Sequence, residues 1–215
     1  MNYNPFSLQE KTILITGASS GIGQAVAIEC SKMGAKIVIT GRNEERLNET
    51  YNRLEGEGHL KIVADLTKEN DVNSLIDFLP LLDGIVHSAG IAMPLPFSFT
   101  TKEKIDTIFS INFASPAIIS QQILKNRKLK IEASIVFISS ISGVICTSTG
   151  GSLYSATKGA VNGLVKGMAV DLASKKIRVN CVNPGMIDTA IFESGVISQE
   201  QLEEDIKKYP LKRYG

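Results

Sequence analysis

The sequence predicts an α/β protein in which helices cover both faces of one doubly wound, parallel β-sheet. Two observations lead to this prediction: short, apolar, β-branched runs recur along the chain, and longer segments with apolar residues at helical spacing separate them. Strands that alternate with helices pair in parallel through right-handed crossovers. We therefore expect ligands to bind beyond the carboxyl ends of the strands.

Six strands and the helices between them follow from these patterns. The apolar runs occupy residues 12–16, 36–40, 60–64, 84–88, 134–139 and 177–182. Apolar residues at helical spacing follow the first and third runs and precede the sixth, where a long helix is expected from Tyr154 to about Asp171. No linker or internal repeat interrupts the series, so we expect one domain over residues 1–215.

Composition narrows the class of partner. The 215 residues are 43% hydrophobic, which is enough for one substantial core. The 23 basic and 22 acidic residues give a net charge of +1, so no basic surface for nucleic acid or for an anionic membrane is expected. Small molecules and copies of the chain itself are the expected partners.

The cysteines and the apolar segments indicate a cytoplasmic protein. Cys30, Cys146 and Cys181 are odd in number and far apart, which fits neither a disulfide framework nor a metal motif, and no metal is expected. The first ten residues lack a basic region followed by an apolar run, and no stretch approaches the roughly 18 apolar residues of a membrane span.

A glycine-rich turn joins the first strand to the first helix. It reads Thr-Gly-Ala-Ser-Ser-Gly-Ile-Gly over residues 16–23. Glycines let the backbone approach a pyrophosphate, and the helix N-terminus offers it free N–H groups. A plain tight turn is the alternative. The candidate cofactor ligands here are Gly17, Ser19, Ser20, Gly21, Ile22 and Gly23.

The end of the second strand bears on cofactor choice. A site that prefers NAD usually places an acidic residue there for the ribose 2′-hydroxyl, whereas an arginine accommodates a 2′-phosphate. Here the acid is missing and Arg42 is present. NADP(H) is therefore favoured and NAD(H) remains possible, the alternative being that Arg42 is only a solvated charge.

Tyr154 and Lys158 form the candidate proton-transfer pair. Residues at i and i+4 share one face of a helix, and an ammonium beside a phenol lowers the phenol pKa from about 10. Most such pairs are only an amphipathic tyrosine beside a solvated lysine. Ser140, which follows the fifth strand, is expected to reach the same edge of the sheet.

In combination, these motifs resemble those of the short-chain dehydrogenase/reductase family, in its compact single-domain branch with a Rossmann-like fold. The resemblance covers residues 6–215. Within the family, the chain resembles 3-oxoacyl-thioester reductases and related carbonyl reductases. Besides the glycine-rich turn, the matching positions in chain order are Asp65-Leu66, Ala89-Gly90, Asn112, Ser140 with Gly143, Tyr154 with Lys158, and Asn183-Pro184-Gly185 with Thr189.

The resemblance implies a reaction in which a nicotinamide delivers hydride to a carbonyl carbon or removes it from an alcohol. Tyr154 would donate the proton, Ser140 would hydrogen-bond the substrate oxygen, and Lys158 would hold the nicotinamide ribose and lower the tyrosine pKa. Asn112 would seat a water in a proton relay. The implied cofactor contacts are Asp65 and Leu66 at adenine, Ser88, Ala89 and Gly90 along the adenosine ribose, and Pro184, Gly185, Ile187 and Thr189 at the nicotinamide half.

Three departures from the family pattern stand out. His87 and Ser88 replace two asparagines, and we expect His87 to be structural. Ser140 and Tyr154 are 154 − 140 = 14 residues apart, one more than expected, so a bulge over residues 146–152 is predicted and Ser139 and Ser142 are alternatives to Ser140. The chain also ends at Gly215, before the helix and seventh strand with which relatives usually finish.

Other expectations concern substrate, assembly and alternative functions. Loops 91–100 and 183–198 would line the pocket with apolar residues, unless these only pack the loops down, and the helices around 101–125 and 154–173 would pair in a homodimer or homotetramer. The alternatives are an NAD-dependent alcohol dehydrogenase of the same family and a non-catalytic, dinucleotide-binding regulator. The expected pocket residues are Met93, Leu95, Phe97, Met186, Ile187, Ile191 and Phe192.

Overall fold

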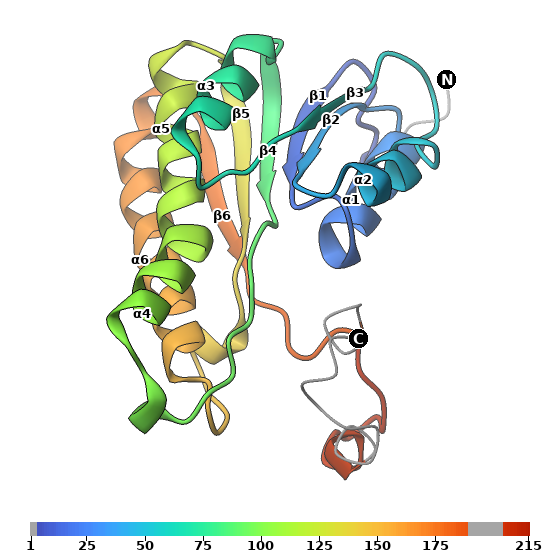
Figure 1. Ribbon diagram of the computed structural model, residues 1–215. Coiled ribbons are helices and arrows are strands. Elements are labelled where there is room, and N and C mark those ends of the chain that lie inside the picture. Colours follow the sequence, from blue (N-terminus) through green and yellow to red (C-terminus); the bar gives the residue numbers. More distant parts are fainter. Residues whose placement is uncertain (1–3, 189–203) are drawn as a thin grey trace.

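A computed structural model describes residues 4–188 and 204–215 (Figure 1). Its centre is a six-stranded parallel sheet in the order β3-β2-β1-β4-β5-β6. The predicted doubly wound sheet is therefore confirmed, and the strand order reverses between β1 and β4, where such folds bind ligands. The strands are β1 (Thr12–Thr16), β2 (Lys36–Gly41), β3 (Leu60–Val63), β4 (Leu82–His87), β5 (Leu129–Ile138) and β6 (Arg178–Val182).

Helices cover both faces of the sheet (Figure 1). One face is covered by α1 (Gly21–Lys32) and α2 (Glu44–Tyr51), and the other by α3 (Glu69–Phe78), α5 (Ser115–Lys125) and α6 (Ser152–Asp171). The remaining helical segments are α4 (Lys102–Phe109), the short helices η1 (Phe97–Phe99), η3 (Ile141–Gly143) and η4 (Ala173–Lys175), and the π-helical turn η2 (Ser110–Ala114).

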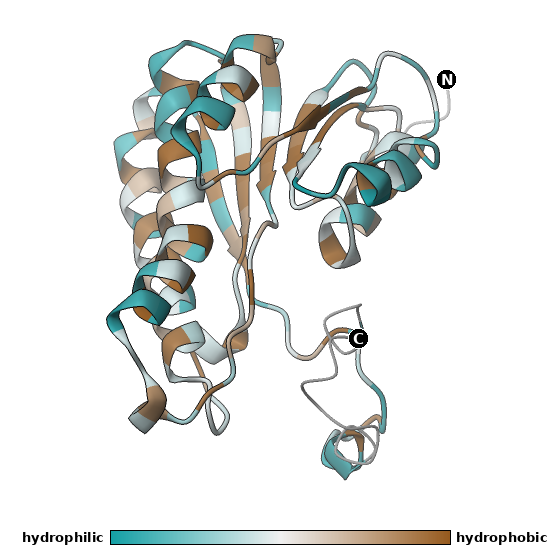
Figure 2. Ribbon diagram, in the orientation of Figure 1, coloured by the Kyte–Doolittle hydropathy of each residue, from teal (hydrophilic) through white to brown (hydrophobic). Residues whose placement is uncertain are grey.

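Alternation along the strands divides the core into two layers. Leu14 of β1 packs in a cluster with α3, α5 and α6, whereas its neighbours Ile13 and Ile15 pack in a second cluster with α1 and α2. This period of two is what a strand buried on both faces requires. Figure 2 shows that hydrophobic residues predominate along the strands, while hydrophilic residues lie mainly in the helices and their connections.

The structure corrects several predicted boundaries. The strand predicted over 84–88 spans Leu82–His87, and β2, β3 and β6 each differ from the prediction by one residue at one end. β5 begins at Leu129, five residues before the predicted start. The sequence pattern missed its first half because the polar residues Lys130 and Glu132 interrupt the apolar run, in the part of the strand where the pairing with β4 shifts register. The long helix begins at Ser152 and not at Tyr154, so Tyr154 lies inside its first turn. Among residues 4–188 and 204–215, no helix is long and apolar enough to cross a membrane.

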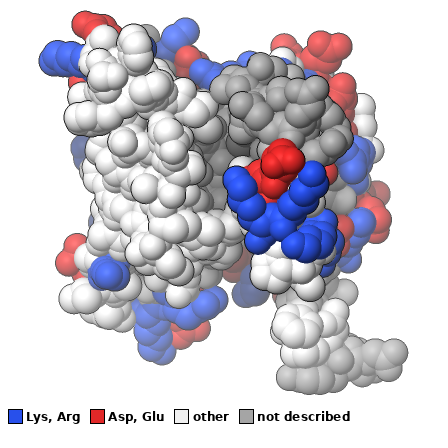
Figure 3. Space-filling view, turned by 90° about the horizontal axis from the view of Figure 1, so that it is seen from below, with Lys and Arg blue, Asp and Glu red and all other residues white. Residues whose placement is uncertain are grey.

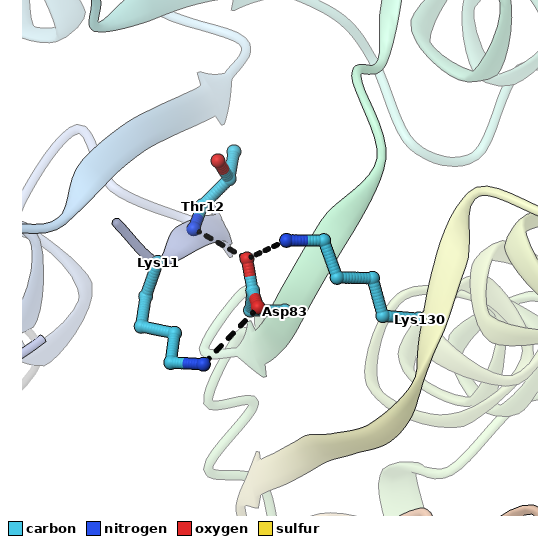
Figure 4. Close-up of polar contacts among 4 residues, drawn as sticks. All are labelled: Lys11, Thr12, Asp83 and Lys130. Atoms are coloured by element: carbon cyan, nitrogen blue, oxygen red, sulfur yellow. Dashed lines mark hydrogen bonds and ion pairs between the residues drawn. The ribbon is translucent and has the colours of Figure 1, made fainter. Parts of the chain in front are cut away.

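Asp83 joins the amino ends of three strands (Figure 4). Its carboxylate accepts hydrogen bonds from the Thr12 backbone N–H at 3.0 Å and from Lys130 Nζ at 2.8 Å, and it pairs with Lys11 at 3.4 Å. Burial alone would raise the pKa of Asp83, but the hydrogen bonds from Lys130 and Thr12 outweigh it and hold the pKa below its usual value. This contact lies at the opposite end of the sheet from the candidate site.

Candidate active site

In the glycine-rich turn, two glycines lie so close to other backbone atoms that no side chain would fit. Gly17 has a φ of +67°, and a Cβ atom there would lie 2.6 Å from the Cα of Ala89. A Cβ atom at Gly23 would lie 2.3 Å from the Gly17 carbonyl oxygen. Real Cβ atoms do not approach that closely, so both positions require glycine and the turn is packed directly against the end of β4.

The N-terminus of α1 suits an anionic group. No acidic residue lies in the first turn of α1, and the side chain of Ser20 at the N-cap makes no capping hydrogen bond. The free N–H groups and the positive end of the helix dipole are therefore available to a pyrophosphate. Ser19, Gly21 and Ile22 belong to the same turn, so the predicted phosphate ligands lie together.

The ends of β2 and β3 form the neighbouring part of the site. Arg42 follows β2 and is exposed, and its charge acts on Asp65, which follows β3. Asp65 accepts hydrogen bonds from the Thr67 hydroxyl at 2.7 Å and from the Thr67 N–H at 3.1 Å. The hydroxyl bond is the largest cause that lowers the pKa of Asp65, and the charge of Arg42 adds to it. No carboxylate stands directly at the end of β2, where Gly41 precedes Arg42.

The end of β4 is held by a residue that the sequence analysis did not include among the site residues. The buried hydroxyl of Thr16 accepts hydrogen bonds from the N–H groups of Ser88 at 3.2 Å and Ala89 at 3.3 Å. A Cβ atom at Gly90 would lie 3.3 Å from Asn112 Oδ1 and 3.7 Å from Lys158 Nζ. The segment 88–90 thus runs from the glycine-rich turn to the candidate proton-transfer groups.

Asn112 lies in the π-helical turn between α4 and α5, and its side chain is fully engaged. Its Oδ1 accepts from the Ile91 N–H at 2.8 Å, while its Nδ2 donates to the Ile91 carbonyl at 3.0 Å and to Thr157 Oγ1 at 3.1 Å. Pro116, four residues later, has no N–H with which to bond the Asn112 carbonyl as an α-helix would. The side chain therefore braces the site, and the backbone carbonyl lacks its usual helical donor.

Tyr154, Lys158 and Ser140 meet at the carboxyl end of the sheet. Lys158 is buried, its Nζ donates to the Ile138 carbonyl at 2.8 Å, and the same atom lies 5.6 Å from the centroid of the Tyr154 ring. Burial lowers the pKa of Lys158 to about 8. Burial raises the pKa of Tyr154, and a hydrogen bond with the Ser140 hydroxyl opposes that increase. In the protein alone, Tyr154 is therefore a neutral phenol beside an ammonium.

The three neighbouring serines have different partners. Ser140 hydrogen-bonds Tyr154 and also accepts from the Ser142 N–H at 3.1 Å. The hydroxyl of Ser139 instead donates to the Lys158 carbonyl at 3.0 Å. Of these serines, Ser140 is thus the one whose hydroxyl lies at the Tyr154 phenol. The sequence analysis also preferred Ser140 to Ser139 and Ser142.

The segment between Ser140 and Tyr154 contains η3 and a loop that packs closely on α6. A Cβ atom at Gly143 would lie 2.4 Å from the Gly159 backbone nitrogen, so η3 touches the backbone of α6. Gly150 has a φ of +77°, and its carbonyl accepts from the Leu95 N–H at 3.0 Å. The loop over residues 146–152, where a bulge was predicted, is therefore joined to the loop after β4.

His87 braces β4 against α5. One ring nitrogen, Nε2, lies 2.9 Å from the hydroxyl of Ser120, which in turn donates to the Pro116 carbonyl at 2.8 Å. Complete burial lowers the pKa of His87 to about 3, so the ring is neutral. Since the Ser120 hydroxyl uses its proton on Pro116, His87 Nε2 is the donor in this pair.

The remaining predicted cofactor residues lie in the segment after β6. The Pro184 carbonyl accepts from the Ile141 N–H at 3.1 Å, which places residues 183–185 beside η3. Gly185 is exposed and Ile187 is half-buried. Thr189, Ile191 and Phe192 lie outside the described residues. In residues 4–188 and 204–215, no cluster of three or more His, Cys, Asp or Glu side chains could hold a metal ion.

The structure places a glycine-rich turn at the switch point of a doubly wound parallel sheet, and a tyrosine, a lysine and a serine at the same sheet edge. This combination is that of a nicotinamide-dinucleotide oxidoreductase. Comparison with known families agrees, because the family model described as short chain dehydrogenase matches residues 11–199. The chain belongs to the short-chain dehydrogenase/reductase family and is an NAD(P)-dependent enzyme.

Individual relatives are similar over nearly the whole chain. A tropinone reductase homolog of Arabidopsis thaliana is 36% identical over 217 aligned positions, which cover 98% of this chain and 82% of the relative. A 3-oxoacyl-(acyl-carrier-protein) reductase of Rickettsia prowazekii is 34% identical and covers 97% of this chain and 85% of its own. The crystal structure of a dehydrogenase/reductase from Sinorhizobium meliloti superposes with a TM-score of 0.84 at 32% identity, covering 98% of this chain and 84% of that one.

Proposed function

We propose that this enzyme transfers a hydride between NADP(H) and a carbonyl compound or secondary alcohol, with Tyr154 as the general acid and base. The observation that carries the proposal is the arrangement in which one phenol meets both the Ser140 hydroxyl and the buried Lys158 ammonium. A group that both donates and accepts a proton must be able to exist in both states, and these two neighbours stabilise the phenolate.

The proton steps assign one role to each group. During reduction, Tyr154 donates its proton to the substrate oxygen, which Ser140 holds by hydrogen bonding, and during oxidation Tyr154 removes that proton. The bound nicotinamide supplies or accepts the hydride and, when oxidised, adds a positive charge. That charge is needed because burial raises the pKa of Tyr154 in the protein alone. Lys158 stabilises the phenolate electrostatically and, at a pKa of about 8, stays mostly charged at neutral pH.

Asn112 fits the relay through its backbone. Its amide side chain is occupied by Ile91 and Thr157, so a water in this position would bond to the Asn112 carbonyl, which lacks a donor from Pro116. We assign Asn112 to holding that water: after Tyr154 gives its proton to the substrate, the Lys158 ammonium would return a proton to the phenolate, and the water would then return one to the neutral Lys158 amine.

Arg42 supports the choice of NADP(H). Its side chain is exposed beside the ends of β2 and β3, where the adenosine ribose is expected, and no carboxylate stands at the end of β2 to repel a 2′-phosphate. Asp65, whose pKa is lowered chiefly by the Thr67 hydroxyl, remains an anion that would contact adenine.

An uncharged substrate suits the surface at the carboxyl end of the sheet. Figure 3, which views this end, shows a broad area without Lys, Arg, Asp or Glu side chains. The loops that follow β4 and β5 expose Phe97 and Ile145, at 70% and 80% of their possible area. Together with the names of the relatives, which include a 3-oxoacyl-(acyl-carrier-protein) reductase, this supports a carbonyl substrate with a sizeable apolar portion.

The test is a substrate screen. NADPH oxidation by the purified protein is followed with ketones, 3-oxoacyl thioesters and keto sugars, and the same panel is run with NADH. Turnover of at least one ketone or thioester with NADPH is expected, with keto sugars as the poorest substrates. A protein that binds NADPH but reduces no member of the panel would contradict the proposal.

We also propose that the enzyme is a cytoplasmic homo-oligomer. A groove of about 450 Å³ runs between α5 and α6 on the outer surface, and apolar residues dominate its lining. The groove lies on the two helices that are expected to pair with a second copy of the chain. The three cysteines are free thiols, which fits a reducing compartment. The groove is lined by Ala117, Ser120, Gln121, Leu124, Lys125, Leu164 and Met168.

A further inference from the structure

Asn162 lies on α6 one helical turn beyond Lys158 and two turns beyond Tyr154, and it is half-buried. Its amide nitrogen donates to three acceptors: the Lys158 carbonyl at 2.8 Å, Ser139 Oγ at 2.9 Å and Asn183 Oδ1 at 3.1 Å. An amide has two hydrogens, so one of them is shared among these acceptors. The three acceptors lie on three different segments of the chain.

These segments are the ones that carry the candidate catalytic groups. Ser139 follows β5 and directly precedes Ser140, while Asn183 follows β6 and directly precedes Pro184. Ser139 is buried and itself donates to the Lys158 carbonyl at 3.0 Å. Asn162 and Ser139 therefore bond to the same carbonyl and to each other, which closes a small polar network under the Lys158 backbone.

The same strand end also holds the charged end of Lys158. Lys158 Nζ donates to the carbonyl of Ile138, the residue before Ser139. Residues 138–140 thus fix the Lys158 ammonium, the Lys158 backbone and the Ser140 hydroxyl in succession. The separation between the β5 end and α6 decides how far Ser140 and Lys158 lie from the Tyr154 phenol, and Asn162 bridges that separation.

We propose that Asn162 is a positioning residue for the reaction, which holds Lys158 and Ser140 in register with Tyr154 by tying the ends of β5 and β6 to α6. This inference rests on the proposed function, since it assigns Asn162 to the proton-transfer unit described above. Asn162 reaches the reacting atoms only through these neighbours.

Among the described residues, few other ionisable groups surround Lys158. Tyr154 lies on the same helix, and the thiol of Cys181 acts on Lys158 from β6. Burial raises the pKa of Cys181, so the thiol is uncharged at neutral pH. Loosening the network would consequently change the pKa of Tyr154 by displacing the Ser140 hydroxyl, whose hydrogen bond lowers it, and the Lys158 ammonium beside the ring.

The experiment titrates the Tyr154 phenol in the full chain saturated with NADP⁺. Near-ultraviolet absorbance of the phenolate is recorded against pH for wild type, Asn162→Ala and Asn162→Asp, with the spectrum of Tyr154→Phe subtracted. Asn73→Asp, at an exposed asparagine of α3, is the matched control. Thermal midpoint, NADPH affinity and the pH dependence of kcat are measured on the same samples.

Both Asn162 variants are expected to raise the apparent pKa of Tyr154 by about one unit, which corresponds to about tenfold less phenolate, and to lower kcat for alcohol oxidation by about the same factor. Asn162→Asp replaces the amide donor by a carboxylate, which also disfavours the phenolate. Asn73→Asp should leave both quantities unchanged. If the Asn162→Ala protein does not fold, Ser139→Ala, which removes one acceptor, should show a smaller shift in the same direction.

Two outcomes are separable. Asn162 variants that lower only the thermal midpoint, with the Tyr154 pKa and kcat of wild type, would overturn the inference, since Asn162 would then be a structural brace. If Tyr154→Phe itself turns over substrate at the wild-type rate, the proposed function fails, and the positioning role fails with it.

Discussion

The ammonium of Lys158 lies over the ring of Tyr154, 5.6 Å from its centroid, and donates a hydrogen bond to the Ile138 carbonyl. The lysine is thus anchored to a strand end, and its ammonium lies beside the Tyr154 ring at a fixed place. Because α6 carries both residues one turn apart and β5 supplies the anchor, the pair depends on how the helix packs against the sheet.

Tyr154→Phe should lower turnover by at least about a hundredfold, the minimum expected of a general acid, and leave NADPH affinity nearly unchanged. Only the hydroxyl is lost, and the ring still packs. Initial rates and fluorescence titration with NADPH measure the two quantities. A Phe variant that keeps more than about a hundredth of the wild-type rate would rule out this mechanism.

In the wild-type enzyme, the rate of alcohol oxidation should rise with pH through one ionisation well below about 10, as expected when positive charges stabilise the phenolate.

Lys158→Met should damage both turnover and NADPH affinity, because it removes the charge near the phenol and the proposed contact with the nicotinamide ribose. The comparison with Tyr154→Phe distinguishes the two roles. Equal NADPH affinity in wild type and Lys158→Met would show that the lysine makes no cofactor contact.

Arg42→Ala should weaken NADPH binding by about 10- to 100-fold, the range expected when one charged hydrogen bond to a phosphate is lost. NADH binding should hardly change, since NADH has no 2′-phosphate. Dissociation constants for both cofactors provide the test, with NADH as the internal control. Equal weakening of the two would mean that Arg42 does not read the 2′-phosphate.

Two glycines differ in how much space surrounds them. A Cβ atom at Gly143 would collide with the backbone of α6, whereas one at Gly167 meets nothing within 4 Å. Gly143→Ala should push η3 away from α6, separate Ser140 from Tyr154 and lower kcat by about tenfold or more, as misplacement of reacting groups does. Gly167→Ala should keep full activity and raise the free energy of unfolding by up to about 1 kcal/mol, the helix-propensity difference. Full activity in both variants would show that η3 can shift without cost.

Asp83→Asn tests the contact at the other end of the sheet. The carboxylate accepts from Thr12 and Lys130, so the variant should unfold with a free energy lower by about 1–3 kcal/mol at neutral pH. Because the folded-state pKa is lowered, this stabilisation is present above the unfolded-state value of about 3.9 and is lost as pH falls through the folded value. Urea denaturation at several pH values measures it, and Asp77→Asn, at an exposed residue, is the control. A difference that persists unchanged in strong acid would contradict the assignment.

Light scattering tests the proposed assembly. The wild-type protein should be a dimer or tetramer at micromolar concentration, and Met168→Glu, which places a charge in the groove between α5 and α6, should dissociate it. Phe6→Glu is the matched control, because Phe6 is 74% exposed and lies away from both helices in the sequence. A monomeric wild type would rule out the oligomer.

The sequence was informative where its patterns are periodic or ordered. The strand ends at Thr16 and Val182 were predicted correctly because buried parallel strands are continuous apolar runs. The sheet-edge neighbours Ser140, Tyr154 and Lys158 were predicted from spacing and motif order, and the structure brings them together. What they do in the reaction remains a proposal.

Other features depended on tertiary contacts that no local pattern records. The first half of β5 carries polar residues such as Lys130, which is satisfied by Asp83 from another strand. Asn162 lies at i+4 from Lys158, so the sequence predicts that both lie on one face of the helix. It does not predict a hydrogen-bonding role for Asn162, because a helical asparagine can equally point into solvent. Only the fold shows that Ser139 and Asn183, which follow two different strands, meet its amide.

The hydrogen bond between the Leu95 N–H and the Gly150 carbonyl has a consequence for how specificity can change. It links the loops after β4 and β5, so a substitution that repositions one loop also moves the other. The loop after β5 also leads directly into α6, whereas the phosphate turn packs on Ala89 through Gly17. Enzymes derived from this chain by mutation should therefore acquire new substrates through paired changes in the two loops, limited to changes that leave the start of α6 and Tyr154 in place.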